Sequence, residues 1–333
     1  MKTRFAFAGF RHSHILDLLA GIEERPDTAL VACCEEDPAT RDALAANGHV
    51  HITHTDFSKM LREVECDAIA IGDYYARRGA LAIEALSAGR HVLSDKPLCT
   101  TLDELAEIER LSAEKNLVVG LQLDSRGSGA FRTLREIIRS GEIGEVCTIR
   151  IDAQHPLLPG SRPAWYFEAG KHGGTINDIG IHAFDFVPWL TGLDWSGITA
   201  ARSWNAKAHN LPHFHDCAQL MATLSNGAGV LADMSYLAPD RLGYQLPHYW
   251  HLLVHGSRGL AETHLTSREV AVITDADTEP QTRPAADQLK RAYLDDFLRV
   301  LGGQADRADL LPADCLRASR LALEAQRFAD CPS

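Results

Sequence analysis

Short apolar runs alternate with amphipathic stretches over the first third of the chain. Apolar residues follow one another closely at 3–8, 29–34, 67–72, 91–94 and 117–121, which predicts a buried strand at each place. Between these runs apolar residues recur at helical spacing, and helices are predicted at 15–24, 39–47, 57–64, 79–89 and 101–116. Strands and helices that alternate this regularly predict an α/β domain with a doubly wound parallel sheet over residues 1–122.

The second half of the chain has longer segments in which apolar and polar residues alternate. Strands are predicted at 148–154, 198–205, 218–224, 230–236 and 250–255, with an edge strand at 269–273. Residues 256–259 (GSRG) are a breaker between elements, and 274–287 is predicted to be an exposed loop. A chain of 333 residues exceeds the usual size of one domain. Residues 123–333 are therefore predicted to form a second α/β domain. In one alternative, the final helices of this domain pack back on the first domain.

The composition is that of an ordinary globular protein, with 45% hydrophobic and 23% charged residues. A formal net charge of -12 repels phosphate backbones and anionic membranes, so neither nucleic acid nor a membrane is expected as a partner. The eight cysteines include no Cys-x-x-Cys pair, and the sequence shows neither a signal peptide nor a run long enough to cross a bilayer. We therefore expect reduced thiols in a cytoplasmic protein.

The turn after the first strand carries an incomplete dinucleotide-binding fingerprint. Where G-x-G-x-x-G would stand, the chain has Gly9, Arg11 and His14, so only the glycine of the tight turn is present. Arg11, His12 or His14 would then contact a pyrophosphate in place of bare backbone, or each is a packing residue. An acid at the end of the second strand of such a unit, here Glu35, accepts hydrogen bonds from a ribose diol.

A lysine stands at the end of the fourth predicted strand, in Ser94-Asp95-Lys96-Pro97-Leu98. Folds of this kind bind ligands at the carboxyl edge of the sheet, so the side chain of Lys96 is expected in the ligand crevice. Pro97 restricts the backbone at Lys96 and permits a cis peptide bond, which would fix the direction of the lysine side chain. A cationic lysine there is suited to stabilise a developing alkoxide.

The segment 173–192, GGTINDIGIHAFDFVPWLTG, places Asp178, His182 and Asp185 at positions i, i+4 and i+7. On an α-helix these side chains share one face, just after a Gly-Gly pair that lets the backbone approach a ligand closely. A histidine beside an orienting carboxylate suits general acid–base catalysis. The alternative is that Asn177 or Asp178 caps a helix and that His182 is an interior histidine with satisfied hydrogen bonds.

Several segments resemble a known enzyme family. AGRHVLSDKPLCTTLDEL, SGEIGEV at 140–146, the 173–192 segment and the C-terminal segments are similar to motifs of the glucose-fructose oxidoreductase, inositol dehydrogenase and MocA family. The resemblance implies a Rossmann domain and an α/β domain with a large, mostly antiparallel sheet, often the interface of a homodimer or homotetramer. It also implies hydride transfer between nicotinamide and a carbon of a sugar, polyol or cyclic alcohol. Lys96 would hold the reacting hydroxyl, His182 would exchange its proton, and Asp178 would orient them.

The cofactor that the resemblance implies is NAD, because Glu35 would repel a 2′-phosphate, with NADP as an alternative. The chain departs from the family after residue 72, where Asp73, Tyr74 and Tyr75 replace the usual Thr-Pro-Asn and Arg78 replaces a histidine. The candidate cofactor-binding residues lie at the ends of the predicted strands and in the first turn. They are Gly9, Phe10, Arg11, His12, His14, Glu35, Gly72, Asp73, Tyr74, Asp95, Lys96 and Gln122.

Two other functions fit the same motifs. One is an enzyme that retains NAD and uses transient oxidation of a sugar to drive glycoside cleavage or epimerisation. The other is a non-catalytic, ligand-sensing member of the family. The incomplete glycine turn favours the sensor, whereas the intact Lys96, Asp178 and His182 disfavour it.

Histidines and aromatic residues of the second half are candidates for a metal site and for sugar binding. His213 and His215 would point the same way on a strand beside Asp216, and imidazole with carboxylate suits zinc. No segment has the His-Glu-x-x-His spacing, so no metal site is expected. The alternatives are that these histidines line a sugar pocket or that they are ordinary surface residues. Trp165 and Tyr166 offer ring faces to a sugar, with core packing as the alternative. The candidate substrate-binding residues are Lys96, Trp165, Tyr166, Asp178 and His182.

Overall fold

The chain divides into two compact units in the computed structural model, which describes residues 2–48 and 50–331. Unit 1 consists of Met1–Leu123, Pro163–Gly173 and Tyr293–Ser319, and unit 2 of Asp124–Arg162, Gly174–Ala292 and Arg320–Ser333. Two segments beyond the predicted boundary at 123, Pro163–Gly173 and Tyr293–Ser319, belong to unit 1, and the second lies in the C-terminal region whose helices one alternative packed on the first domain. The cause is side-chain packing: Phe297, for example, packs on Phe5 of the first strand with ring centroids 6.1 Å apart.

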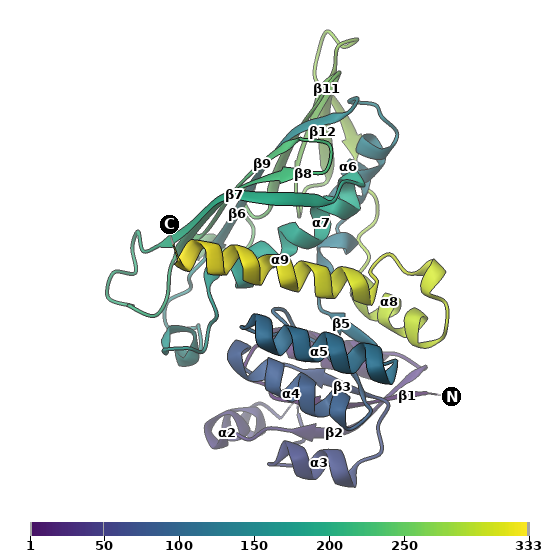
Figure 1. Cartoon of the computed structure of the whole chain (residues 1–333), viewed down its shortest axis with the longest axis vertical. Coiled ribbons are helices and arrows are strands. Elements are labelled where there is room, and N and C mark those ends of the chain that lie inside the picture. Colours follow the sequence, from purple (N-terminus) through teal and green to yellow (C-terminus); the bar gives the residue numbers. More distant parts are fainter. Residues whose placement is uncertain (1, 49, 332–333) are drawn as a thin grey trace. The chain divides into compact units, whose positions relative to one another are not determined.

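Unit 1 is built on the predicted parallel sheet, with the strand order β2-β1-β3-β4-β5 (Figure 1). The strands are β1 (Thr3–Ala8), β2 (Thr28–Cys34), β3 (Ala68–Ile71), β4 (His91–Ser94) and β5 (Val119–Leu121). All neighbouring pairs are parallel, and the strands are short apolar runs because both faces of such a sheet are covered. The loops that follow the strands therefore all leave the sheet at its carboxyl edge.

Side-chain caps start several helices of unit 1. The helices are α1 (His14–Glu24), α2 (Pro38–Asn47), α3 (Phe57–Glu63), α4 (Tyr75–Ser87), α5 (Leu102–Lys115) and α8 (Ala292–Leu301), with 3-10 turns η2 (Ala164–Phe167) and η5 (Ala305–Arg307). The hydroxyl of Thr101 accepts the N–H of Glu104 at 3.2 Å and caps α5, as the Thr-Leu-Asp-Glu sequence predicts. α4 begins about one turn before its predicted start. α4 and α5 lie side by side over the sheet (Figure 1).

Unit 2 is built on an eight-stranded sheet of order β13-β12-β11-β10-β6-β9-β8-β7. The strands are β6 (Val146–Pro156), β7 (Trp195–Trp204), β8 (Cys217–Leu224), β9 (Gly229–Ala238), β10 (His251–Gly256), β11 (Gly259–His264), β12 (Glu269–Thr274) and β13 (Gln281–Pro284). The neighbouring strands pair antiparallel, except that β6 and β9 are parallel. The mostly antiparallel second sheet is therefore confirmed.

The sequence pattern misses two strands of this sheet. The GSRG breaker is the turn of a hairpin, since Gly256 pairs with Gly259 and β11 follows at once. β13 lies inside the segment that was predicted to be a loop, and all of its residues are exposed. It is held by backbone pairing with β12, and an edge strand held in this way needs no apolar side chains. Its composition therefore resembles that of a loop.

The eight-stranded sheet has one covered face and one open face. Helices α6 (Gly129–Arg139) and α7 (Ile181–Thr191) lie on the covered side (Figure 1). Residues of β9 alternate accordingly: Val230 and Ala232 are buried, whereas Leu231 is 54% exposed. Leu231 and Met221 line a groove of about 480 Å³ on the open face. Helix α9 (Pro312–Asp330) begins in unit 1 and belongs to unit 2 from Arg320 onwards.

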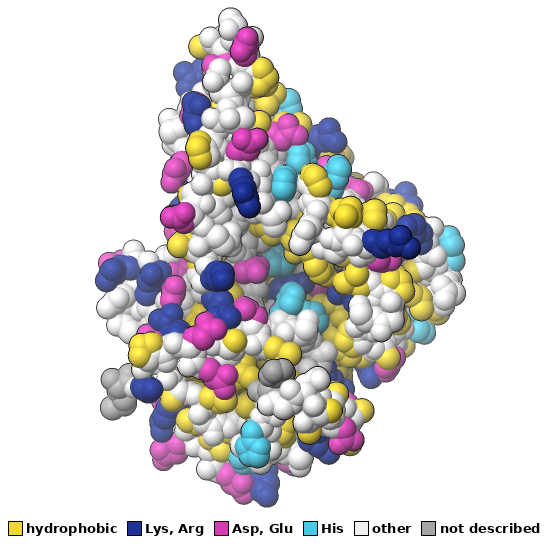
Figure 2. Space-filling model, turned by 180° about the vertical axis from the view of Figure 1, so that it is seen from behind, with side chains coloured by type: hydrophobic (Ala, Val, Ile, Leu, Met, Phe, Trp, Pro, Cys, Tyr) yellow, Lys and Arg dark blue, Asp and Glu magenta, His cyan; other side chains and the backbone are white. Residues whose placement is uncertain are grey.

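Acidic and basic side chains are interspersed on the surface shown in Figure 2, as expected for a chain with many charges of both signs. Among the described residues, no helix combines the length and the apolar character needed to cross a membrane. No disulfide bond joins cysteines in that part of the chain. Burial raises the pKa of the Cys33 and Cys34 thiols to about 12, so both stay protonated near neutral pH.

Candidate active site

Gly9 closes the turn after β1 in a conformation that requires glycine. Its φ is 79°, and a Cβ atom there would lie 2.6 Å from Cβ of Asp73. Gly72, at the end of β3, is as confined, because a Cβ atom there would overlap the side chain of Ile15 in α1. The ends of β1 and β3 and the first turn of α1 are therefore packed closely. This is the arrangement that lets a backbone turn approach a phosphate group.

Arg11 stands where the second glycine of the fingerprint would be, and it faces three carboxylates. Its Nε lies 3.3 Å from Oδ1 of Asp73 and 3.6 Å from Oε1 of Glu35. Its Nη2 lies 3.7 Å from Oδ1 of Asp37, and the guanidinium lies over the ring of Tyr74 at 5.1 Å from the centroid. Nε is buried and has no hydrogen-bond partner among the described residues. Arg11 is therefore held by the carboxylates at the ends of β2 and β3.

Glu35, predicted to accept hydrogen bonds from a ribose, is turned into the protein. Its carboxylate is fully buried and accepts the backbone N–H of Phe10 at 2.7 Å and that of Asp37 at 2.8 Å. Burial raises the pKa of Glu35, although the two N–H groups oppose this shift. In this conformation Glu35 ties the turn after β1 to the end of β2, and the half-buried Asp37 is the carboxylate closer to solvent.

Arg78 organises the end of β4, a role that its sequence context does not indicate. Its guanidinium is fully buried, and Nε donates to the carbonyl oxygen of Asp73 at 2.7 Å. Nη2 donates to Oδ2 of Asp95 at 2.8 Å, and Nη1 donates to the carbonyl oxygens of Lys96 and Pro97. The peptide bond between Lys96 and Pro97 is cis. Lys96 is only 6% exposed, so the lysine predicted at the carboxyl edge of the sheet lies there largely out of water.

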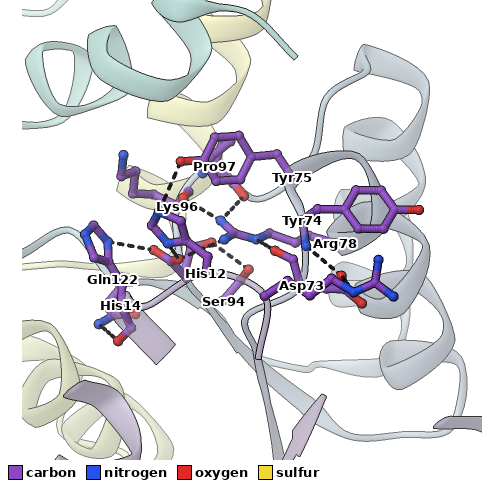
Figure 3. Close-up of polar contacts among 12 residues, drawn as sticks. His12, His14, Asp73, Tyr74, Tyr75, Arg78, Ser94, Lys96, Pro97 and Gln122 are labelled. Carbon is purple, nitrogen blue, oxygen red and sulfur yellow. Dashed lines mark hydrogen bonds and ion pairs between the residues drawn. The ribbon is translucent and has the colours of Figure 1, made fainter. Parts of the chain in front are cut away.

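Figure 3 shows His12, His14 and Arg78, and all three contact the carboxylate of Asp95. Nδ1 of His12 lies 2.5 Å from Oδ2, and Nδ1 of His14 lies 3.3 Å from Oδ1. Burial alone would raise the pKa of Asp95, but Arg78 and the histidines hold it well below its usual range. Burial lowers the pKa of His12 to about 4, so its imidazole is neutral near pH 7. Gln122 donates to the backbone carbonyl oxygen of His14 at 3.0 Å and so holds the backbone of this half-exposed residue.

Trp165 and Tyr166, two candidate substrate-binding residues, lie in unit 1 and are buried. The ring of Trp165 is 4.9 Å from that of Tyr75, and its Nε1 donates to the carbonyl oxygen of Arg11 at 3.1 Å. The hydroxyl of Tyr166 lies 3.1 Å from Nε2 of His12 and 2.5 Å from the hydroxyl of Tyr75. The two residues therefore hold their segment against the turn after β1.

In unit 2 the Gly-Gly pair leads into a π-helical turn, η3 (Ile176–Gly180), which continues directly into α7. The prediction of an unbroken α-helix through Asp178 is therefore wrong. A π turn contains more residues than an α turn, so the i, i+4 argument that placed Asp178 directly below His182 does not apply. Such turns are frequent at functional sites, and the local sequence pattern did not reveal this one.

Asp178 and His182 are both buried and are held by residues from other elements. The carboxylate of Asp178 accepts a hydrogen bond from the hydroxyl of Tyr236 in β9. Nδ1 of His182 lies 3.4 Å from Oγ of Ser125, and its ring packs edge-on against Trp250 at 5.3 Å. A buried imidazole with a fixed ring and a buried carboxylate nearby in sequence are groups that can exchange and direct a proton.

Asp185 forms a buried ion pair with Arg126 of η1 (Asp124–Gly127). Nε of Arg126 lies 3.1 Å and 3.2 Å from the two carboxylate oxygens, and Nη2 lies 2.6 Å from Oδ1. The side chains are 5% and 0% exposed. Asp185 thus anchors the helix that carries His182. Neither Arg126 nor Ser125 was predicted from the sequence, because neither stands in a motif or in a periodic pattern.

The histidines of unit 2 form no metal cluster within residues 2–48 and 50–331. His213 and His215 lie in the loop before β8, so the prediction that they share a strand is wrong. Nδ1 of His215 lies 2.8 Å from Oγ of Ser203, and Asp216 accepts three backbone N–H groups of residues 206–208. These polar residues stabilise a loop locally.

Both halves of the chain match one family of proteins. Residues 4–123 match the family described as "Oxidoreductase family, NAD-binding Rossmann fold", and residues 131–262 match "GFO/IDH/MocA C-terminal domain". Inositol 2-dehydrogenase of Corynebacterium glutamicum is 25% identical over 236 residues, which cover 69% of this chain and 66% of that protein. An uncharacterized oxidoreductase of Synechocystis is 24% identical over 180 residues. The match covers 52% of this chain and 47% of that protein, so the chain spans about half the length of this relative.

A solved structure shows the same fold. The inositol dehydrogenase homologue of Azotobacter vinelandii, complexed with NAD+, superposes with a TM-score of 0.81. The match covers 99% of this chain and 96% of that chain at 18% sequence identity. The order of the two sheets along the chain is therefore common to both proteins.

Proposed function

The chain belongs to the GFO/IDH/MocA oxidoreductase family, and on that premise we propose that it transfers a hydride between a nicotinamide dinucleotide and a carbon of a sugar, polyol or cyclic alcohol. The observation that carries the proposal is Lys96, a buried lysine at the carboxyl end of β4 in a domain of the NAD-binding Rossmann type. A cation there is suited to hold a hydroxyl oxygen as it gains negative charge. The relative named inositol 2-dehydrogenase supports a polyol as the substrate class.

The turn after β1 fits the phosphate groups of such a cofactor. Gly9 keeps the turn tight, α1 begins at His14 shortly after it, and the guanidinium of Arg11 lies in the same turn. A helix N-terminus beside an arginine is a favourable place for phosphate oxygens. Glu35 contributes by shaping this turn through the N–H of Phe10. When bound, the nicotinamide ring supplies the hydride acceptor or donor.

The residues of the chain handle the hydroxyl group and its proton. Oxidation of a carbinol releases a hydride from carbon and a proton from oxygen, and the proton needs an acceptor. We assign this role to the buried imidazole of His182, whose Nδ1 lies 3.4 Å from Oγ of Ser125. Asp178, whose carboxylate accepts a hydrogen bond from the hydroxyl of Tyr236, would orient the groups that exchange the proton. Lys96 stabilises the alkoxide while the hydride leaves.

Binding of NADH to the purified protein tests this proposal. We expect a dissociation constant in the micromolar range by fluorescence or calorimetric titration, with NADPH measured in parallel. A panel of sugars, polyols and cyclitols incubated with NAD+ is expected to include a substrate that produces NADH, followed by absorbance. Product formation without a net absorbance change would point instead to an enzyme that retains NAD. Absence of NADH binding would contradict the proposal and favour a ligand sensor.

We also propose that the open face of the eight-stranded sheet binds a second copy of this chain. The groove on this face combines exposed Leu231 and Met221 with charges of both signs, as in Arg202 and Asp152. A face that is apolar at its centre and carries both charges can be self-complementary, as an interface with two-fold symmetry requires.

Introducing a charge into this face is expected to dissociate the assembly. Leu231→Lys should convert a dimer or tetramer into a smaller species, measured by sedimentation velocity at equal protein concentration. Leu242→Lys, at a residue that is 56% exposed outside the sheet, is the matched control and should leave the mass unchanged. A wild-type monomer, or an unchanged mass for Leu231→Lys, would rule the interface out.

A further inference from the structure

His12, His14 and Asp95 place three potential metal-ligand side chains around one point of unit 1. The two Nδ1 atoms approach the two oxygens of one carboxylate, at 2.5 Å for His12 and 3.3 Å for His14. The potential ligand atoms of the three residues all lie within 4.8 Å of one another. The centroids of the two imidazole rings are 4.4 Å apart.

We propose that His12, His14 and Asp95 bind a divalent transition-metal ion of the zinc class, with a water molecule or a ligand oxygen in the remaining position. Three protein ligands of nitrogen and oxygen type with one open position are the donor set of catalytic zinc sites. The same set of two histidines and one carboxylate also binds other divalent first-row metals. The site would lie at the carboxyl end of β4, where the sequence predicts cofactor contacts.

The distances around Asp95 fit such an ion after a small movement of His12. Metal bonds of about 2.0–2.1 Å at a tetrahedral angle place two ligand atoms about 3.3 Å apart. This is the separation of Nδ1 of His14 and Oδ1 of Asp95. His12 is closer to the carboxylate because it is hydrogen-bonded to it, and Nδ1 would exchange this hydrogen bond for a bond to the metal.

The surrounding residues make the contacts that hold metal ligands in place in other proteins. A metal-bound imidazole usually donates its second N–H to a fixed acceptor, and a ligating carboxylate is itself hydrogen-bonded. Nε2 of His12 lies 3.1 Å from the hydroxyl of Tyr166. Nη2 of Arg78 donates to Oδ2 of Asp95, which leaves Oδ1 beside His14 for the ion. On metal binding, His12 would therefore keep its contact with Tyr166, and Asp95 would keep its hydrogen bond from Arg78.

His14 gives the ion access from solvent. Its side chain is 52% exposed, whereas those of His12 and Asp95 are 6% and 0% exposed. An ion held by these residues would be open on the side of His14, where water or a hydroxyl or phosphate oxygen of a ligand completes its coordination. The inference does not depend on the proposed hydride transfer, because a ligand-sensing protein would bind the ion through the same residues.

Metal titration of the full-length protein tests the site. The protein is prepared without a polyhistidine tag, freed of metal with a chelator, and titrated near neutral pH with zinc chloride and with cobalt chloride. We expect one zinc ion per chain by calorimetry and by metal analysis after gel filtration. Cobalt should give the visible absorption of a four-coordinate site. Tyr166→Phe, which removes an outer contact of His12, should weaken zinc binding by about 10-fold.

Ligand variants separate this site from adventitious binding. His14→Ala should fold normally, because the side chain is half-exposed, and should weaken zinc binding by more than the roughly 100-fold upper limit for outer contacts. His51→Ala, at an exposed histidine of unit 1, is the matched control and should bind zinc as the wild type does. Failure of the wild type to bind either metal, or equal binding by His14→Ala, would overturn the proposal and leave both histidines as hydrogen-bond partners of Asp95.

Discussion

Replacement of Lys96 by alanine should lower kcat by about 10²–10³-fold, the loss that follows removal of one group that stabilises a developing oxyanion. The lysine is largely out of water, so its charge acts on the substrate oxygen with little screening. Because the interaction strengthens as the alkoxide forms, the effect should appear in kcat rather than in KM. Steady-state kinetics with the substrate identified from the panel would measure both constants, and NADH titration would check cofactor binding separately.

One control variant and one further active-site variant show whether the loss of kcat in Lys96→Ala is specific. Lys59→Ala removes an exposed lysine of unit 1, 59% accessible on α3, and should leave kcat unchanged. His182→Ala removes the assigned proton acceptor and should also lower kcat, by about 10²–10⁴-fold. A Lys96→Ala protein that keeps its activity would contradict the role of the lysine. Activity retained in both Lys96→Ala and His182→Ala would exclude the proposed chemistry.

Replacement of Arg126 by methionine should destabilise unit 2 by about 3–5 kcal/mol, because it leaves Asp185 buried without its counter-charge. Both side chains are almost completely buried, so solvent does not screen the loss. Thermal unfolding followed by circular dichroism should show the change as a lower midpoint, by roughly 2–4 °C for each kcal/mol.

The double variant Arg126→Met with Asp185→Leu distinguishes a lost ion pair from lost packing. Replacing both charges by apolar side chains of similar size removes the uncompensated carboxylate, and it should restore most of the stability. Arg110→Met, which breaks two exposed pairs on α5, should shift the midpoint much less. If the double variant is no more stable than Arg126→Met, the uncompensated charge of Asp185 is not the cause of the loss.

The sequence determined the parts of the fold that depend on neighbours along the chain. The strands and helices of unit 1 follow from apolar runs and helical spacing, and the Thr101 cap was visible as a local motif. The position of Lys96 was predictable for the same reason, since it immediately follows a short buried strand whose carboxyl end faces the ligand in parallel sheets. The strand β13 was missed because an edge strand is held by its backbone and leaves no apolar pattern.

The partners of the site residues were decided only by the tertiary structure. Asp95 is 83 positions from His12, and Arg126 is 59 positions from Asp185. The local sequence around one member of each pair does not predict the other member. The same holds for Glu35, which the fold turns inward to the N–H of Phe10, and for Asp178, which the π turn moves out of the predicted register. Periodicity reports which side of an element is buried, whereas a buried charge takes whichever partner packing brings within hydrogen-bond distance. The sequence thus determined where the candidate site lies, and the packing of distant segments decided how its charges are paired.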